Sequence, residues 1–112
     1  MPPGARQTPR MTPAVLPIAL DADEIARFCS GCGIRRLALF GSVLRDDFTP
    51  ASDVDMLVEY LPGRHPGLML FRQQEELATR LSRAVDLHTP ASLSRHFRDE
   101  VLTDALPIYE QA

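Results

Sequence analysis

The pattern of apolar and polar residues first predicts a helix near residue 21. Apolar side chains recur there at intervals of three and four residues, which places one face of the helix in a core; they are Ile25, Phe28, Cys29 and Cys32. Asp21 can cap the start of this helix, because Glu24 follows at the spacing of a capping box. Gly33 is well placed to end it.

Two apolar runs after this helix are predicted strands. The run 36–40 is short and ends at a glycine, which is typical of a buried strand. In the run 53–60 every second residue is apolar, and these residues share one face: Val54, Met56, Val58 and Tyr60. Because side chains alternate along a strand, Asp53 and Asp55 then lie together on the opposite face.

The remaining elements follow a turn-rich loop at 61–67. A helix is predicted from Leu68 to about Arg83, with an apolar stripe of Phe71, Gln74, Leu77, Ala78 and Leu81. A short strand is predicted at 84–88. A last helix starts from a cap at Ser92 or Ser94, runs through Leu106 and is ended by Pro107. This order predicts an α+β domain, with helices packed on one face of a small mixed β-sheet of three or four strands.

Length and composition favour one globular domain. The chain has 112 residues, and five of its ten prolines lie before residue 19. We therefore expect residues 1–18 to be a disordered tail and residues 19–112 to form the domain. The net charge of −3 argues against a dedicated nucleic-acid binder. No apolar run is long enough to cross a bilayer, and the N-terminus lacks the pattern of a signal peptide, so we expect a cytoplasmic protein.

The two cysteines form a C-x-x-C pair, Cys29 and Cys32, which raises the question of metal or redox chemistry. A structural zinc site needs two more ligands at matching spacing, and the sequence has no second pair of this kind. Both cysteines lie on the apolar stripe of the first predicted helix. We interpret them as small core residues.

Asp53 and Asp55 are candidate metal ligands. On one face of a strand their backbone positions are about 7 Å apart, so the two carboxylates can converge on one point. Without a cation they repel each other and the pKa of one rises, whereas a divalent metal removes the conflict. Asp86 stands alone among apolar residues of the third predicted strand. If that strand neighbours the second, Asp86 reaches the same centre, where two metal ions can be held.

Gly41 and Ser42 form the complementary half of the candidate site. Glycine lets the backbone approach a ligand closely, and backbone N–H groups with the Ser42 hydroxyl can hold phosphate oxygens. Arg45 is a candidate for a further phosphate contact, although an exposed arginine is the commoner interpretation. His88 shares the face of Asp86, and we interpret it as a polar strand end rather than a residue lining the site.

The combined pattern of Gly41-Ser42, ten residues, and Asp53-Val54-Asp55 resembles the signature of the DNA polymerase beta-like nucleotidyltransferase superfamily. The stretch "LALFGSVLRDDFTPASDVDMLVEY" is most similar to the minimal members, the MNT-domain proteins. The resemblance covers roughly residues 21 to 110, and "LPIYE" is similar to the usual C-terminus. The segment 43–48 departs from the pattern, because it is less basic and lacks glycine. We interpret Asp46 and Asp47 as solvated loop acids.

This resemblance implies an activity and a partner. Minimal members are commonly antitoxins that transfer AMP from ATP to a tyrosine hydroxyl of a HEPN-domain ribonuclease toxin, with which they form a hetero-oligomer. It implies that Asp53 and Asp55 bind Mg²⁺ and that Gly41 and Ser42 hold the triphosphate. Asp86 would complete a second Mg²⁺ site and help to deprotonate the acceptor. Neither a membrane nor direct nucleic-acid binding is expected.

Two other functions are compatible with the sequence. The protein could neutralise its partner by contact alone, as an MNT-fold binding module without catalysis. It could also be a nucleotidyltransferase that acts on RNA ends or on a small hydroxylated molecule. The presence of all three acids favours catalysis over simple binding. The acidic charge and the lack of a second domain favour a protein acceptor.

Overall fold

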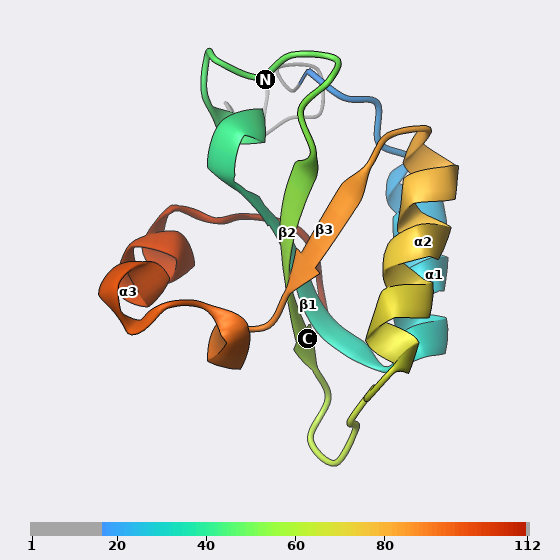
Figure 1. Cartoon of the computed structure of the whole chain (residues 1–112). Coiled ribbons are helices and arrows are strands. Elements are labelled where there is room, and N and C mark those ends of the chain that lie inside the picture. The colour runs from blue at the N-terminus through green and yellow to red at the C-terminus, as the bar shows by residue number, and fades with distance from the viewer. Residues whose placement is uncertain (1–16, 112) are drawn as a thin grey trace, which may run out of the picture.

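The computed structural model describes residues 17–111 (Figure 1). Its elements in chain order are α1 (Ala22–Cys32), β1 (Ile34–Phe40), the 3-10 turn η3 (Gly41–Leu44), β2 (Val54–Tyr60), α2 (Met69–Leu81), β3 (Val85–His88), the 3-10 turn η4 (Pro90–Ser92), α3 (Arg95–Asp104) and β4 (Leu106–Glu110). The predicted tail lies outside the described residues except for Pro17 and Ile18. Ile18 is buried in the core, so the packed part of the chain begins no later than this residue.

The four strands form one mixed sheet in the order β3-β2-β1-β4. Strand β1 pairs antiparallel with both β2 and β4, and β2 pairs parallel with β3. Helix α2 makes the crossover that a parallel pair requires. The predicted α+β fold with a small mixed sheet is therefore confirmed.

The main core lies between the sheet and helices α1 and α2, which cover one face together (Figure 1). The first helix begins and ends as predicted: the Asp21 side chain accepts hydrogen bonds from two first-turn N–H groups, and Gly33 is left-handed at φ 71°. The alternation predicted for β2 is also confirmed, because Val54, Met56 and Val58 are buried in this core.

Helix α3 lies on the opposite side of the sheet, contrary to the expectation that all helices pack on one face (Figure 1). A second cluster of buried residues explains this position: Ala38, Phe40, Leu57, Leu93 and Ala105. From Leu37 to Phe40, strand β1 is apolar on both faces, so both faces of this part must be shielded from water. The segment from η4 through α3 supplies the cover on the second face.

The C-terminal segment corrects another prediction. The last helix ends at Asp104, and Leu106 begins the strand β4 instead of extending the helix. Pro107 lies inside this strand, opposite Ala38 of β1. Because β4 is an edge strand, a proline there need not cost a ladder hydrogen bond. The residue that was expected to stop a helix is thus accommodated at the edge of the sheet.

Helix α2 packs largely as predicted, with one exception at Phe71. Leu77 is fully buried, and Ala78 and Leu81 pack partly against the core. Gln73, however, is 7% exposed, whereas Phe71 is 59% exposed. The buried amide of Gln73 is compensated by a hydrogen bond of 2.6 Å that its Oε1 accepts from the hydroxyl of Tyr60. A polar residue can therefore face the core here, while Phe71 remains outside it.

Both cysteines carry free thiols, and Cys29 is fully buried. Burial raises the pKa of the Cys29 thiol to about 12, so this side chain is protonated at neutral pH. This confirms the interpretation of Cys29 as a core residue. Among residues 17–111, no helix has the length and apolar character needed to cross a membrane.

Candidate active site

Three polar side chains from adjacent strands meet on the sheet face that α3 partly covers. In the parallel ladder, Asp55 of β2 pairs with Asp86 of β3, and Leu57 pairs with His88. The neighbouring residues Val85 and Leu87 are buried in the main core. Since side chains alternate along a strand, Asp86 and His88 must point to the same face as Asp55.

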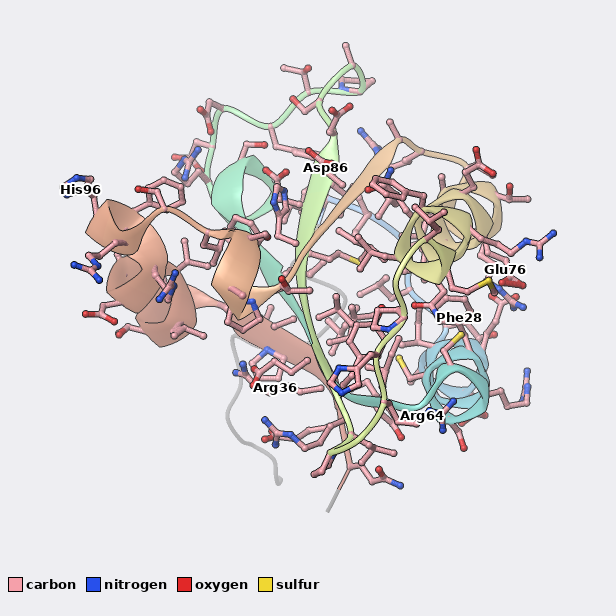
Figure 2. The ribbon with its side chains drawn as sticks, turned by 60° about the horizontal axis from the view of Figure 1, so that its bottom comes forward. Phe28, Arg36, Arg64, Glu76, Asp86 and His96 are labelled. Carbon is pink, nitrogen blue, oxygen red and sulfur yellow. The ribbon has the colours of Figure 1, made fainter. Side chains whose placement is uncertain are left out.

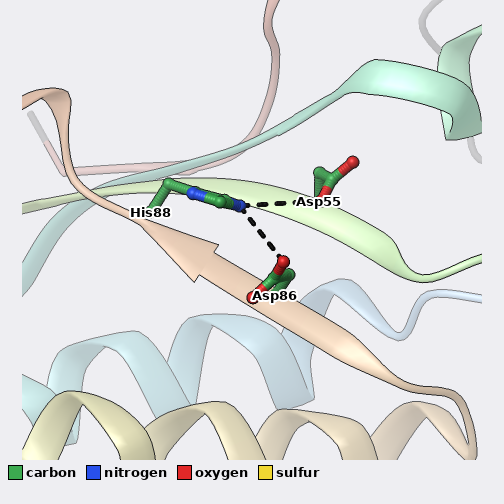
Figure 3. A group of neighbouring side chains, drawn as sticks. All are labelled: Asp55, Asp86 and His88. Atoms are coloured by element: carbon green, nitrogen blue, oxygen red, sulfur yellow. Dashed lines mark ion pairs between the residues drawn. The ribbon is translucent and has the colours of Figure 1, made fainter. Parts of the chain in front are cut away.

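The imidazole of His88 points toward both carboxylates (Figure 3). Its Nε2 is 3.6 Å from Oδ1 of Asp55 and 3.5 Å from Oδ2 of Asp86. The ring of Phe40 packs edge-on against it, with the ring centroids 5.3 Å apart and the planes at 70°. Phe40, which lies on β1 across β2 from β3, therefore restricts the orientation of the imidazole.

The turn after β1 approaches the same cluster. Gly41 has φ 80°, a conformation that costs an L-residue energy. A Cβ atom at this position would lie 2.7 Å from Oδ2 of Asp55. The buried side chain of Val43 anchors the turn in the core. Gly41 is thus required both for its backbone angle and for the space beside Asp55.

The electrostatics of the cluster are unfavourable to the Asp55 carboxylate. Partial burial is the largest cause of its raised pKa, and the charges of Asp86 and Asp53 add to it. A positively charged His88 imidazole acts in the opposite direction. Asp53 itself lies just before β2 and is exposed. It is near enough to affect Asp55 but does not belong to the group of three donors.

Of the other two predicted phosphate contacts, Arg45 lines an open groove and Ser42 lies in the adjoining turn. Ser42 is half-buried within η3. The Arg45 side chain is 63% exposed, and its Nε lies 3.5 Å from Oδ1 of Asp47. The groove has a volume of about 580 Å³, and its walls come from the end of β1, from η3 and from α3: Phe40, Gly41, Leu44, Arg45, Phe97, Glu100, Val101 and Asp104. Its volume falls in the range of small-molecule sites.

The loop between η3 and β2 is held to the start of β3 by Arg83. The guanidinium lies over the ring of Phe48, 4.6 Å from its centroid, and donates a hydrogen bond of 2.9 Å to the carbonyl of Thr49. The N–H of Val54 also donates to the carbonyl of Ala84. These contacts fix the loop that joins the phosphate-side turn to the acids.

The donor set fits a divalent cation. Asp55, Asp86 and His88 each offer one ligand atom, and these atoms all lie within 4.8 Å of one another. Two carboxylates this close repel each other, and a dication between them would remove the repulsion and lower the pKa of Asp55. The raised pKa in the metal-free protein is consistent with a site built for positive charge.

The structure thus brings Asp55 and Asp86 together as expected, with Gly41 against them. It places Asp53 at the margin and His88 beside both Asp55 and Asp86, so the interpretation of His88 as a simple strand end is wrong. The sequence feature that could have placed His88 in the site is its spacing of two residues from Asp86. That spacing puts both side chains on one face of the strand, but it gives no distance to Asp55 on another strand.

Replacing Gly41 by Ala tests the close approach to Asp55. Gly63 has nearly the same φ, 82°, with nothing within 4 Å of an added Cβ, so it is a matched control. Both variants lose about 1–2 kcal/mol of unfolding free energy because of the positive φ. Only Gly41→Ala displaces the Asp55 carboxylate, so its affinity for Mn²⁺, measured by titration, falls about tenfold or more. Equal Mn²⁺ affinities in the two variants would contradict the placement of Gly41 against a metal-binding Asp55.

The raised pKa of Asp55 predicts a pH dependence of stability. The folded state binds this proton more tightly than the unfolded state, so stability falls as pH rises through the folded pKa. In chelator, Asp55→Asn is therefore more stable than wild type at pH 7, and the difference shrinks as pH falls toward the ordinary value of 3.8. Urea denaturation at each pH measures the free energy of unfolding of wild type and of Asp55→Asn, and the exposed Asp46→Asn is the control. A difference that does not change with pH would refute the prediction.

Comparison with known proteins agrees with this geometry. Residues 23–109 match the family model described as a nucleotidyltransferase domain. The chain is 34% identical over 76 residues to "Putative protein adenylyltransferase MJ0435" of Methanocaldococcus jannaschii, covering 68% of this chain and 81% of that protein.

Two solved structures show the same fold. One, described as "Structure of putative minimal nucleotidyltransferase", is 31% identical with a TM-score of 0.65, over 77% of this chain and 87% of that chain. The other, a toxin-antitoxin with AMP-PNP, is 22% identical with a TM-score of 0.62, over 82% and 75% of the two chains. The chain belongs to the nucleotidyltransferase domain family, and its fold is that of a minimal nucleotidyltransferase.

Proposed function

We propose that this protein is an antitoxin that transfers AMP from ATP to a tyrosine hydroxyl of a cognate HEPN ribonuclease toxin. The observation that carries the proposal is the convergence of Asp55 and Asp86 beside the Gly41 turn. The family supplies nucleotidyl transfer as the reaction. The name of the M. jannaschii relative supports AMP as the group and a protein as the acceptor.

Nucleotide binding is assigned to the turn and the groove. Backbone N–H groups of Gly41 and Ser42, with the Ser42 hydroxyl, hold phosphate oxygens. Arg45 is exposed at the groove, and its ion pair with Asp47 is long, at 3.5 Å. Its guanidinium can therefore leave Asp47 and bind a phosphate. The groove beside the turn has room for the rest of the nucleotide.

Family members generally use a nucleoside triphosphate and a divalent metal ion. In this protein Asp53, Asp55 and Asp86 would hold Mg²⁺, and we propose two ions. Bound metal would neutralise the carboxylates together with the negative charge that builds up on the phosphate. Asp53 contributes from the exposed margin of the site, next to the half-buried Asp55.

The chain positions the reactants and receives the proton. The acceptor oxygen forms a bond to the α-phosphorus of ATP while the bond to the bridging oxygen breaks, and pyrophosphate leaves. Asp86 accepts the proton of the attacking hydroxyl; its side chain is 51% exposed and can be reached by an acceptor from outside. The rigid strands that carry Asp55 and Asp86 keep both in place, which is most of what such a transfer needs.

A macromolecular acceptor agrees with the openness of the site. The groove lies at the surface, and Phe97 on its wall is 44% exposed. The toxin-antitoxin structure with AMP-PNP shares the fold, which supports a hetero-oligomer with a toxin as partner. The acidic net charge fits a protein acceptor better than direct nucleic-acid binding. The cytoplasm, where ATP is available, is the proposed location.

Mass spectrometry of the partner tests the proposal. We expect the toxin encoded beside this protein to gain the mass of one or more AMP groups on a tyrosine when the two are co-expressed. Asp55→Asn removes a charge at the centre of the site and should abolish the increments, and Asp53→Asn should reduce them strongly. The matched control is Asp46→Asn, an exposed acid of the preceding loop, which should leave them unchanged.

The same experiment separates catalysis from neutralisation by contact. If Asp55→Asn and Asp53→Asn still protect cells from the toxin while no increments are found, the protein is a binding module. If wild type modifies RNA ends or a small hydroxylated molecule and leaves the partner unmodified, the acceptor assignment is wrong.

A further inference from the structure

We propose that His88 is a metal ligand beside Asp55 and Asp86, and that its imidazole makes the site prefer a first-row transition-metal dication such as Mn²⁺ over Mg²⁺. The inference deepens the proposed function, because it concerns the metal of the same site. It starts from the position of Nε2, which lies 3.6 Å from Oδ1 of Asp55 and 3.5 Å from Oδ2 of Asp86.

The separations between the three donor atoms suit one shared ion. Ligand atoms about 2.1 Å from a metal are about 3 Å apart at a right angle and about 3.4 Å apart at the tetrahedral angle. The two distances from Nε2, 3.6 and 3.5 Å, exceed the right-angle value by about half an ångström and the tetrahedral value by about 0.2 Å or less, which side-chain rotations can close. All three donors come from neighbouring strands, so the backbone already brings them to one place.

The imidazole is held in the orientation that ligation needs. Figure 3 shows Nε2 directed between the two carboxylates. The edge-on contact with Phe40 restricts rotation of the ring, and Phe40 is itself only 9% exposed. A buried aromatic residue next to Gly41 thus positions His88 over the site.

A role for His88 as a fixed cation is less consistent with the site. A protonated Nε2 would occupy the same carboxylate oxygens that the family's metal requires, and would repel that metal. A neutral imidazole offers a lone pair at the same place instead. With a metal bound, ligation is therefore the arrangement that uses all three groups without conflict.

The donor set determines the preference among metals. Mg²⁺ favours oxygen ligands, near-ideal octahedral geometry and retained waters. Imidazole nitrogen binds first-row transition metals more readily, while carboxylates suit Mn²⁺ as well as Mg²⁺. Replacing a water by Nε2 of His88 should therefore strengthen binding of Mn²⁺ with little effect on Mg²⁺.

Pulsed EPR of the purified full chain loaded with Mn²⁺ tests ligation directly. We expect coupling of the manganese to an imidazole nitrogen, absent in His88→Val, where valine keeps a strand-forming residue. His96→Val is the matched control, because His96 is exposed on α3, away from Asp86 (Figure 2). By titration, His88→Val should weaken Mn²⁺ binding about tenfold or more and change Mg²⁺ binding less than about twofold.

Wild type alone can overturn the inference, whether or not the variant folds. Mn²⁺ bound at the site without nitrogen coupling would show that His88 is not a ligand. Equal losses of Mn²⁺ and Mg²⁺ affinity in folded His88→Val would refute the metal preference. Nitrogen coupling without AMP transfer would refute the proposed function and leave this inference standing, whereas transfer without coupling would do the reverse.

Discussion

The parallel pairing of β2 with β3 fixes the site, because it places Asp55 beside Asp86 and leaves both outside the core. A slip of one residue in β3 would turn Asp86 inward and expose Val85 and Leu87, which are 7% and 5% exposed. Burial of these two side chains contributes about 3–6 kcal/mol. Repulsion between two carboxylates near the surface costs about 1–4 kcal/mol at about 4 Å. Core burial therefore outweighs the repulsion and holds the acids together.

Several residues around the site adopt arrangements that would be unfavourable elsewhere. Asp55 is partly buried with a raised pKa, and Gly41 has a backbone angle that other residues avoid. Such local costs persist where the surrounding structure over-determines them, and they concentrate at functional sites. Here the surroundings are specific: Val43 anchors the turn, and Arg83 holds the loop by its contacts to Phe48 and Thr49. The strained turn at Gly41 and the acidic side chains are thus held by the same set of packed segments.

The alternation of side chains made much of this predictable from sequence. It gave the inward face of β2 and, from that, the outward position of Asp55. Helix α1 was predictable at both ends because Asp21 and Gly33 act through local backbone chemistry. These features depend on neighbours in the chain, so the sequence carries them directly.

The features that were missed depend on contacts between distant segments. Strand β4 forms because β1 offers it a partner, and Pro107 gives no local sign of an edge strand. Gln73 takes a buried position through its hydrogen bond with Tyr60 of strand β2, and Phe71 on the same helix as Gln73 remains exposed. The place of His88 follows from the β2–β3 register, which periodicity in one strand cannot supply.

Anomalous diffraction would test the central claim, that acids from two strands form one metal–nucleotide site, most directly. Crystals of the full chain grown with Mn²⁺ and a non-hydrolysable ATP analogue should show a manganese peak in contact with Asp55 and Asp86. The triphosphate should lie against Gly41 and Ser42. A nucleotide bound elsewhere, or a manganese peak that touches neither carboxylate, would contradict the account.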